Sequence, residues 1–244
     1  MRLELANVSK AFGASPVLSN IDLQIGKGEV VALLGDNGAG KSTLIKIISG
    51  FHAPSSGSLT WEGQKVDFAN FSPRRAQAMG IQTVHQHLGL VEKLSIARNF
   101  FLGREPKKRS LGLRMLDTKL MKSVVMSQLE RMKVSRKLKP ETAIADLSGG
   151  ERQALAIARA CYFGARLLIL DEPTSALSIN QTEQVLNIIR DAKKQGISVV
   201  FITHTLHHIR EIVDTAIILR KGIVTAKLNA PLDERECARL ISGA

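Results

Sequence analysis

The sequence has little cysteine, few aromatic residues and no long apolar run. Only Cys161 and Cys237 occur among 244 residues, outside any CxxC spacing, which disfavours a disulfide framework and a zinc site. Aromatic residues make up 4% of the chain, and no residue type dominates a segment, so disordered, collagenous and low-complexity classes are disfavoured. The longest apolar runs, such as Val30–Leu34, fall far below the roughly 20 residues of a spanning helix. We expect a globular chain, and the lack of an apolar leader after Met1 favours a cytoplasmic one.

Basic residues are in excess, and most of that excess is local. The formal net charge is +12, from 34 lysines and arginines against 22 acidic residues. Between Arg104 and Lys139 there are twelve basic residues and three acidic ones, an excess of nine (12 − 3). A basic segment favours an anionic partner, such as nucleic acid, acidic lipid or a phosphate ligand, and a solvated helix face is the alternative.

Hydrophobic periodicity predicts an α/β fold with a mixed sheet. Ile21, Leu23 and Ile25 alternate with polar residues, as in a half-solvated antiparallel strand, whereas Val30–Leu34 is continuously apolar, as in a strand covered on both faces. Start signals for a helix stand at Ser72 and Pro73.

Residues 90–140 are predicted as a helical insertion in this α/β pattern. Apolar residues recur there at helical spacing: Leu116, Leu120, Val124, Leu129 and Met132. Beyond Ala143 the pattern resumes, with buried strands at Leu167–Leu170 and Ser198–Ile202 and a helix at Gln181–Lys194 between them.

A glycine-rich motif lies between the Val30–Leu34 strand and the apolar helix Leu44–Ile48. It fits GxxxxGK[ST], and with the following threonine it consists of Gly35, Asp36, Asn37, Gly38, Ala39, Gly40, Lys41, Ser42 and Thr43. Glycines let backbone N–H groups turn inward around phosphates at a helix N-terminus. We expect Lys41 to bridge the β- and γ-phosphates of ATP and Ser42 to bind Mg²⁺.

Two adjacent carboxylates end the strand Leu167–Leu170. Asp171 and Glu172 emerge at the edge where open α/β sheets bind ligands. We expect Asp171 to hold the magnesium and Glu172 to orient or deprotonate the attacking water. The two motifs together indicate a P-loop NTPase.

A third motif narrows the class. Ser148, Gly149 and Gly150, with Leu147 and Glu151 on either side, resemble the signature of ATP-binding-cassette (ABC) proteins. The motif predicts free donors at a helix N-terminus, a second anion site. An ordinary helix cap has the same residues, but the other two motifs favour the signature.

The resemblance to ABC proteins implies further roles. Gln86 matches the glutamine that contacts the metal region and the membrane partner, and His204 matches the histidine at the γ-phosphate. Phe12 matches the aromatic residue that stacks on adenine. The family usually has an aspartate where this chain has Ser178, which bears on coupling between paired sites.

The segment from Val84 to Glu105 is similar to bacterial simple-sugar importers of the ribose, xylose and fructose type. The resemblance implies a single-cassette ATPase acting as a homodimer, with two Mg-ATP sandwiched head to tail. Its expected partners are membrane permease subunits at the inner face of the plasma membrane and, indirectly, a periplasmic sugar-binding protein.

The expected architecture is therefore an α/β P-loop NTPase with a RecA-like mixed sheet, an antiparallel β subdomain and a helical ABC-specific subdomain. Residues 1–244 are taken as one ABC domain, with 1–85 and 143–244 as the core and 86–142 as the helical subdomain. An ABC exporter ATPase remains an alternative, because it shares every catalytic motif. A soluble ABC ATPase acting on nucleic acid or ribosomes is the other, but no nucleic-acid partner is expected, because the insertion is short.

Overall fold

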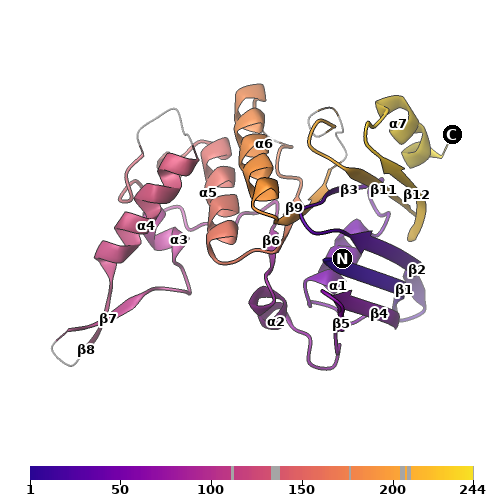
Figure 1. The fold of residues 1–244 in the computed structure, drawn as a ribbon, viewed down its shortest axis with the longest axis horizontal. Helices are drawn as coiled ribbons and strands as arrows, with labels where there is room; N and C mark the ends of the chain where they lie inside the picture. The colour runs from indigo at the N-terminus through magenta and orange to yellow at the C-terminus, as the bar shows by residue number, and fades with distance from the viewer. Residues whose placement is uncertain (111–112, 133–137, 176, 204–206, 208–209, 244) are drawn as a thin grey trace. The chain divides into compact units, whose positions relative to one another are not determined.

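The computed structural model describes residues 1–110, 113–132, 138–175, 177–203, 207 and 210–243 (Figure 1). They form two compact units. The first consists of residues 1–86, 160–175 and 189–244, and the second of residues 87–159 and 176–188.

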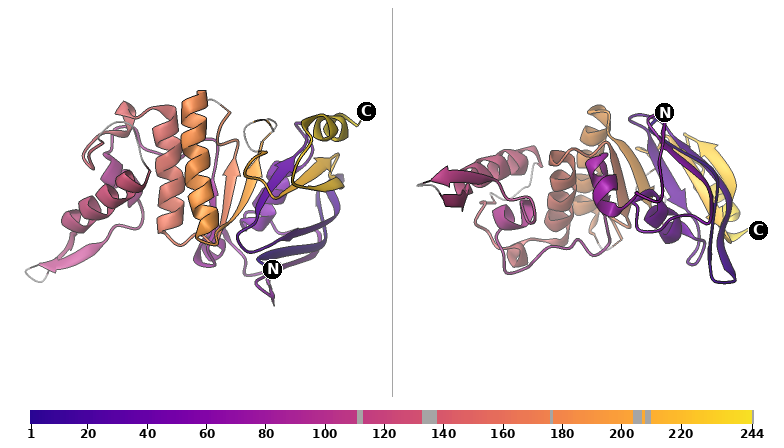
Figure 2. Two further views of the ribbon diagram at one scale, coloured as in Figure 1. Left: turned by 45° about the horizontal axis from the view of Figure 1, so that its top comes forward. Right: turned by 90° about the horizontal axis from the view of Figure 1, so that it is seen from below.

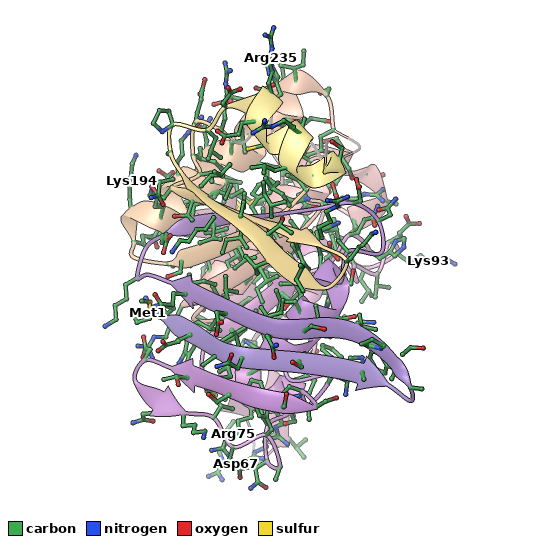
Figure 3. All side chains as sticks on the ribbon, turned by 90° about the vertical axis from the view of Figure 1, so that its right-hand side faces the viewer. Met1, Asp67, Arg75, Lys93, Lys194 and Arg235 are labelled. Atoms are coloured by element: carbon green, nitrogen blue, oxygen red, sulfur yellow. The ribbon has the colours of Figure 1, made fainter. Side chains whose placement is uncertain are left out.

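An antiparallel sheet of four strands belongs to the first unit (Figure 3). In spatial order the strands are β2 (Ser15–Ile25), β1 (Leu3–Phe12), β4 (Ser56–Trp61) and β5 (Gln64–Lys65). The alternation predicted for Ile21, Leu23 and Ile25 is confirmed, since these three side chains are buried and those between them are exposed. The sheet thus packs one face on the core.

A second sheet of six strands forms the centre of the same unit. Its order is β12 (Ile223–Asn229), β11 (Thr215–Arg220), β3 (Val30–Leu34), β10 (Ser198–Ile202), β9 (Leu167–Asp171) and β6 (Ile81–Val84). All neighbours are parallel except β11 and β12, so the predicted mixed sheet is confirmed. Every residue of β3 and β10 is buried, as continuous apolar runs predict.

Three helices complete the first unit: α1 (Lys41–Ile48), α2 (Pro73–Ala78) and α7 (Glu234–Ser242). The α2 start is confirmed, because the Ser72 hydroxyl accepts from the Arg75 N–H at 3.4 Å and Pro73 follows the cap. Helix α6 (Ile179–Lys194) begins in the second unit and ends in the first.

The second unit is mainly helical and contains a hairpin (Figure 2). Its elements are α3 (Ile96–Phe100), β7 (Lys107–Ser110), β8 (Leu113–Leu116), α4 (Thr118–Arg131), the 3-10 turn η1 (Ile144–Asp146) and most of α5 (Gly149–Tyr162). The subdomain boundary predicted at residues 86–142 stays a prediction; the compact unit also takes in most of α5 and the start of α6.

Two expectations for this region were wrong in detail. The β7–β8 hairpin interrupts the predicted helical insertion. In α4 the buried residues are Met121, Val125 and Leu129, while Leu120 is 45% exposed. The helical period was correct, and the predicted Leu129 and Met132 are buried. In the first turns of α4, however, Met121 and Val125 form the packed face, each one residue after the predicted Leu120 and Val124.

Among the described residues, no helix is long and apolar enough to cross a membrane.

Candidate functional site

The glycine-rich motif forms a tight turn between β3 and α1. Gly35, Gly38 and Gly40 have φ values of 149°, 80° and 104°, where a side chain would be strained. Gly35 also has no room for a side chain, because an added Cβ would lie 2.1 Å from the Leu219 carbonyl oxygen. Gly40 is the N-cap of α1, and no side chain accepts a hydrogen bond there. The first N–H groups of α1 are thus left for an anionic ligand.

The Lys41 side chain folds back over this turn. Its Nζ donates to the carbonyl oxygens of Gly35 at 2.6 Å and Asp36 at 2.9 Å. Burial lowers the pKa of Lys41, and nearby carboxylates oppose that shift, those of Glu172, Asp36 and Asp171. The Lys41 ammonium group is therefore held inside the loop, close to acidic groups.

The two predicted carboxylates lie where β9 ends. Burial raises the pKa of Asp171, and the charges of His85 and Lys41 act against that shift. Glu172 has a φ of 49°, a conformation that residues with side chains rarely adopt. Its N–H donates to the Ile202 carbonyl at 3.0 Å, and its Oε2 accepts from the Thr203 hydroxyl at 3.4 Å. Such strain beside a pocket is typical of functional sites.

These groups share one pocket of about 340 Å³ within the first unit. Its lining consists of Val17, Asn37, Gly38, Ala39, Gly40, Lys41, Ser42, Thr43, Gln86, Asp171, Glu172 and Ile202. Gly35 and Asp36 belong to the same loop without lining the pocket. Strands β3, β9 and β10 are parallel neighbours, so the pocket lies at the carboxyl edge of the sheet, where such sheets bind ligands.

Residues 18–175 match the family model described as "ABC transporter". The chain belongs to the ABC transporter family. A xylose/arabinose import ATP-binding protein of Sulfolobus acidocaldarius is 44% identical over 223 residues, which is 90% of this chain and 85% of the relative. A fructose import ATP-binding protein of Rhizobium meliloti is 39% identical, over 87% of this chain and 82% of the relative.

A ribose import ATP-binding protein of Rubrobacter xylanophilus is 37% identical over 99% of this chain, and the chain spans 47% of that relative's length.

Solved structures of ATP-binding cassettes have the same fold as this chain. An ATP-binding cassette of an ABC transporter in its ADP conformation has a TM-score of 0.83 at 23% identity, over 99% of this chain and 94% of that one. A dimeric cassette in a post-hydrolysis state, bound to ADP and Pi, has a TM-score of 0.75 at 25% identity, over 93% and 98%. The predicted P-loop fold is confirmed, and the chain is an ABC-type ATPase.

The ABC signature residues lie in the second unit. The N–H of Ser148 donates to Glu151 Oε2 at 2.7 Å, and the N–H of Glu151 donates to the Ser148 hydroxyl at 3.3 Å. This is a capping box, the ordinary helix cap that the sequence left open. Gly150 is also needed for packing, because an added Cβ would lie 2.7 Å from the Gln181 Cβ. The nucleotide role of Ser148, Gly149 and Gly150 stays a prediction.

His204 and Phe12 are the two other residues predicted for the ABC site. His204 lies outside the described residues. Phe12 is 46% exposed and packs edge-on against His52, with 5.3 Å between ring centroids, while the Lys10 ammonium lies 5.0 Å from its ring. Phe12 does not line the pocket, so its contact with adenine stays a prediction.

Sequence reasoning missed three residues of the pocket region: Val17, Ile202 and Thr203. Val17 comes from the antiparallel sheet, and no motif marks it. Thr203 follows the buried strand β10 directly, so its place at the carboxyl edge was a usable signal.

Ser178, which stands where the family usually has an aspartate, directly precedes α6. Its N–H donates to Gln181 Oε1 at 3.1 Å, and its carbonyl accepts from the Thr182 N–H at 2.8 Å. Ser178 and Gln181 thus have the spacing of a capping box.

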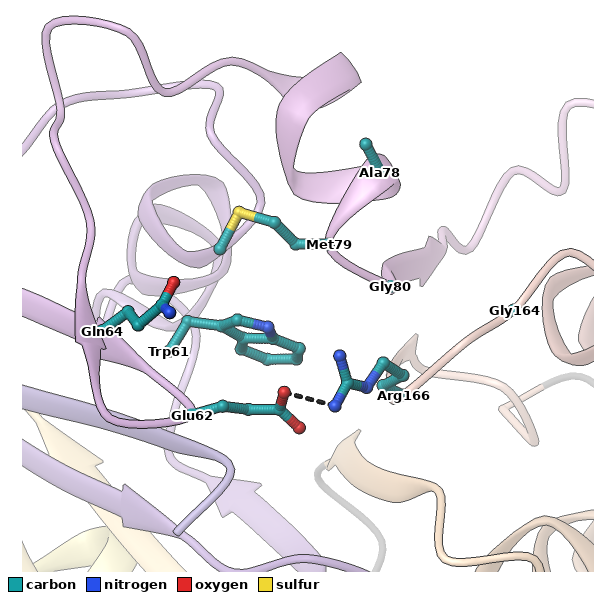
Figure 4. A pocket seen from close by; sticks show the side chains of 8 residues that line it. All are labelled: Trp61, Glu62, Gln64, Ala78, Met79, Gly80, Gly164 and Arg166. Carbon is teal, nitrogen blue, oxygen red and sulfur yellow. Dashed lines mark ion pairs between the residues drawn. The ribbon is translucent and has the colours of Figure 1, made fainter.

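A larger pocket, of about 410 Å³, lies at the other edge of the six-stranded sheet (Figure 4). Gly80 and Arg166 line it, and they precede the amino ends of β6 and β9. Glu62 forms ion pairs with both Arg2 and Arg166. This pocket contains none of the predicted site residues, and its carboxylate is already paired.

Proposed function

We propose that this cassette is the ATP-hydrolysing subunit of an importer for a simple sugar, acting as a homodimer on membrane permease subunits. The observation that carries the ATPase part is the pocket in which Lys41, at the start of α1, meets Asp171 and Glu172, at the end of β9. The names of the relatives, which are import proteins for xylose, arabinose, fructose and ribose, support the sugar. A peripheral position on the cytoplasmic face of the plasma membrane follows from this role, with a periplasmic sugar-binding protein as an indirect partner.

The P-loop would hold the phosphates of ATP. Its inward N–H groups and the start of α1 supply donors, and Lys41 supplies the charge at the β- and γ-phosphates. When ATP enters, the Nζ of Lys41 exchanges its carbonyl partners for phosphate oxygens. Burial within the loop strengthens that interaction.

The donor set in the pocket fits magnesium. A hydroxyl from Ser42, a carboxylate from Asp171 and an amide from Gln86 all line it, and such hard oxygen donors suit Mg²⁺. These three residues would hold the ion, which supplies charge neutralisation at the phosphates.

Glu172 is the proposed general base. Its backbone strain and its bond to Thr203 fix the carboxylate at the end of β9, in the pocket with Lys41. There it would accept a proton from the water that attacks the γ-phosphorus. His204 is assigned to the γ-phosphate by family resemblance alone.

The signature of a second copy would complete each site. In the proposed head-to-tail pair, Ser148, Gly149 and Gly150 of one chain face the ATP held by Lys41 of the other. Phe12 is proposed to contact the adenine. Dimeric cassettes among the solved structures support such pairing.

The mechanism and the dimer are tested together by Glu172→Gln. The amide keeps size and most hydrogen bonds but is not a base, so ATP binding should survive and hydrolysis should fall by at least about a thousandfold. Uncleaved ATP should hold the pair closed. Size-exclusion chromatography with and without Mg-ATP measures this, and Glu172→Gln with Ser148→Arg should remain monomeric. A Glu172→Gln protein saturated with ATP yet monomeric would contradict the head-to-tail pair.

The sugar is tested by uptake. In cells lacking this chain, import of radiolabelled xylose, arabinose, ribose and fructose is measured after complementation with the parent or with Glu172→Gln. The parent alone should restore uptake of one of them. If the parent restores none while its ATPase is intact, the sugar assignment is wrong and the ATPase assignment stands.

A further inference from the structure

The β7–β8 hairpin projects beyond α3 and α4 of its own unit (Figure 2). Its base is closed by a hydrogen bond from the Asp117 N–H to the Pro106 carbonyl at 2.8 Å, and the Asp117 carboxylate then caps α4 by accepting from the Leu120 N–H at 3.0 Å. The base of the two strands is therefore joined directly to the start of α4.

The two faces of this hairpin differ in character. Directly opposed residues share a face in an antiparallel pair, and successive residues alternate. Arg109 lies opposite Arg114, and Lys107 lies two residues away on that same face. On the other face Lys108 lies opposite Met115, with Leu113 two residues along. One face, the basic face, has three cations beside the half-buried Leu116, and the other combines Lys108 with the exposed Leu113 and Met115.

The basic face is unfavourable by itself. Like charges directly opposite each other destabilise a strand pair, and Arg109 and Arg114 are such a pair. Lys107, Lys108, Arg109 and Arg114 are all exposed, and none forms an ion pair with another described residue. Glu105, just before the hairpin, accepts a hydrogen bond from the Gly103 N–H at 3.0 Å. Bonds to backbone N–H groups are the main cause of its lowered pKa, and the charges of Lys107 and Arg98 add smaller effects, so this acid is held mainly by its own turn.

The other face exposes apolar area. Leu113 is 68% exposed and Met115 is 52% exposed. Clustered cations beside exposed aliphatic side chains suit the boundary of an anionic bilayer, where cations attract phosphates and apolar groups enter the acyl region. Long Lys and Arg stems reach the headgroups from either face. Neither strand contains an aromatic residue, which disfavours stacking on single-stranded nucleic acid.

We propose that the β7–β8 hairpin binds the surface of membranes rich in anionic phospholipid, through Lys107, Lys108, Arg109 and Arg114, with Leu113 and Met115 entering the headgroup boundary. This goes beyond the proposed transport role, because it assigns the chain a lipid contact of its own. It requires neither ATP nor a permease.

The test measures co-sedimentation of the purified chain with vesicles. Binding is expected to mixed phosphatidylcholine and phosphatidylglycerol vesicles, to decrease with added salt, and to be weak for pure phosphatidylcholine. Substitution of the four cations by Gln should weaken binding at least about tenfold, since the surface potential acts on each of them. A matched control replaces two lysines and two arginines elsewhere, Lys27, Lys65, Arg74 and Arg235, which are also exposed.

The contribution of the two apolar side chains to vesicle binding is tested by the double variant Leu113→Ser with Met115→Ser. We expect a several-fold loss of vesicle binding that salt does not reproduce. The control is Ile223→Ser, at a residue 47% exposed on β12 of the first unit. All variants should retain the parent's ATPase in solution, because none lies in the nucleotide pocket.

Three results would overturn the proposal. The first is equal loss of binding in the hairpin and control variants. The second is equal binding to both kinds of vesicle. The third is absence of vesicle binding while the hairpin cations support steep, salt-dependent binding of duplex DNA or of an acidic protein. None of them bears on the ATPase assignment, which stands on turnover measured without lipid.

Discussion

The N-termini of α1 and α5 both lie in glycine-rich segments, but their N–H groups are capped differently. At the start of α1 the cap is Gly40, in a left-handed conformation, and no side chain accepts a hydrogen bond from the first turn. At the start of α5 Ser148 and Glu151 close a reciprocal capping box. The same local chemistry thus leaves donors for a ligand in one place and satisfies them internally in the other. The start of α1 therefore offers N–H donors to an anion, whereas two N–H groups at the start of α5 already have partners within the chain.

The largest effect on activity is expected at the N-terminus of α1. Lys41→Ala removes the cation of the P-loop, so ATP turnover should fall by about a thousandfold. The unfolding free energy without nucleotide should not decrease, because burial already penalises the Lys41 charge. Turnover and nucleotide binding measured by fluorescence check this. Lys46→Ala, at an exposed lysine of the same helix, is the control; equal losses in both variants would remove Lys41 from the site.

A smaller effect is expected from the loop backbone. Gly35→Ala places a Cβ 2.1 Å from the Leu219 carbonyl oxygen, so the unfolding free energy should fall by about 2 kcal/mol in urea titrations. Gly38 has open space around it, and Gly38→Ala should cost only its left-handed backbone, about 1 kcal/mol. Equal costs would mean that the contact with Leu219 is relieved by movement of the loop.

The N-terminus of α5 should respond to substitution as a helix cap does. Ser148→Ala removes the hydroxyl that accepts from the Glu151 N–H, so the unfolding free energy should fall by about 1 kcal/mol. Ser148→Asp should restore most of it, since aspartate caps as well as serine. Denaturant unfolding of the three proteins gives the answer, and a neutral Ser148→Ala would contradict the capping role.

The smallest effect concerns pH and Asp171. Burial raises the pKa of Asp171 above its usual value of 3.8, so the fold favours the neutral acid. The stabilising contribution is present below that value and is lost as pH rises through the folded-state pKa. Asp171→Asn resembles the neutral form, so it should match the parent in acid and melt at a slightly higher temperature near neutral pH. Thermal unfolding across a pH series tests this, and a constant difference would rule out the titration.

Much of this protein was predictable from local sequence. The P-loop, the paired acids after β9 and the buried runs of β3 and β10 are short patterns whose chemistry depends on neighbouring residues. The cap at Ser72 is equally local, because hydroxyl, proline and helix start lie within one turn. For such features the residues that decide the structure are adjacent in the chain.

Other features depended on tertiary packing. Periodicity predicted a helix near residue 120 but not its packed face, because Met121 and Val125 face their neighbours while Leu120 remains 45% exposed. Val17 lines the pocket at the P-loop from a separate sheet, and Phe12 packs against His52 instead of lining that pocket. The register of the β7–β8 hairpin places Arg109 opposite Arg114, and no local sequence pattern predicts that pairing. Sequence alone determined which chemical groups this ATPase has. Which of them meet was decided by tertiary contacts between segments far apart in the chain, since packing energy and not local preference selects the face that is buried.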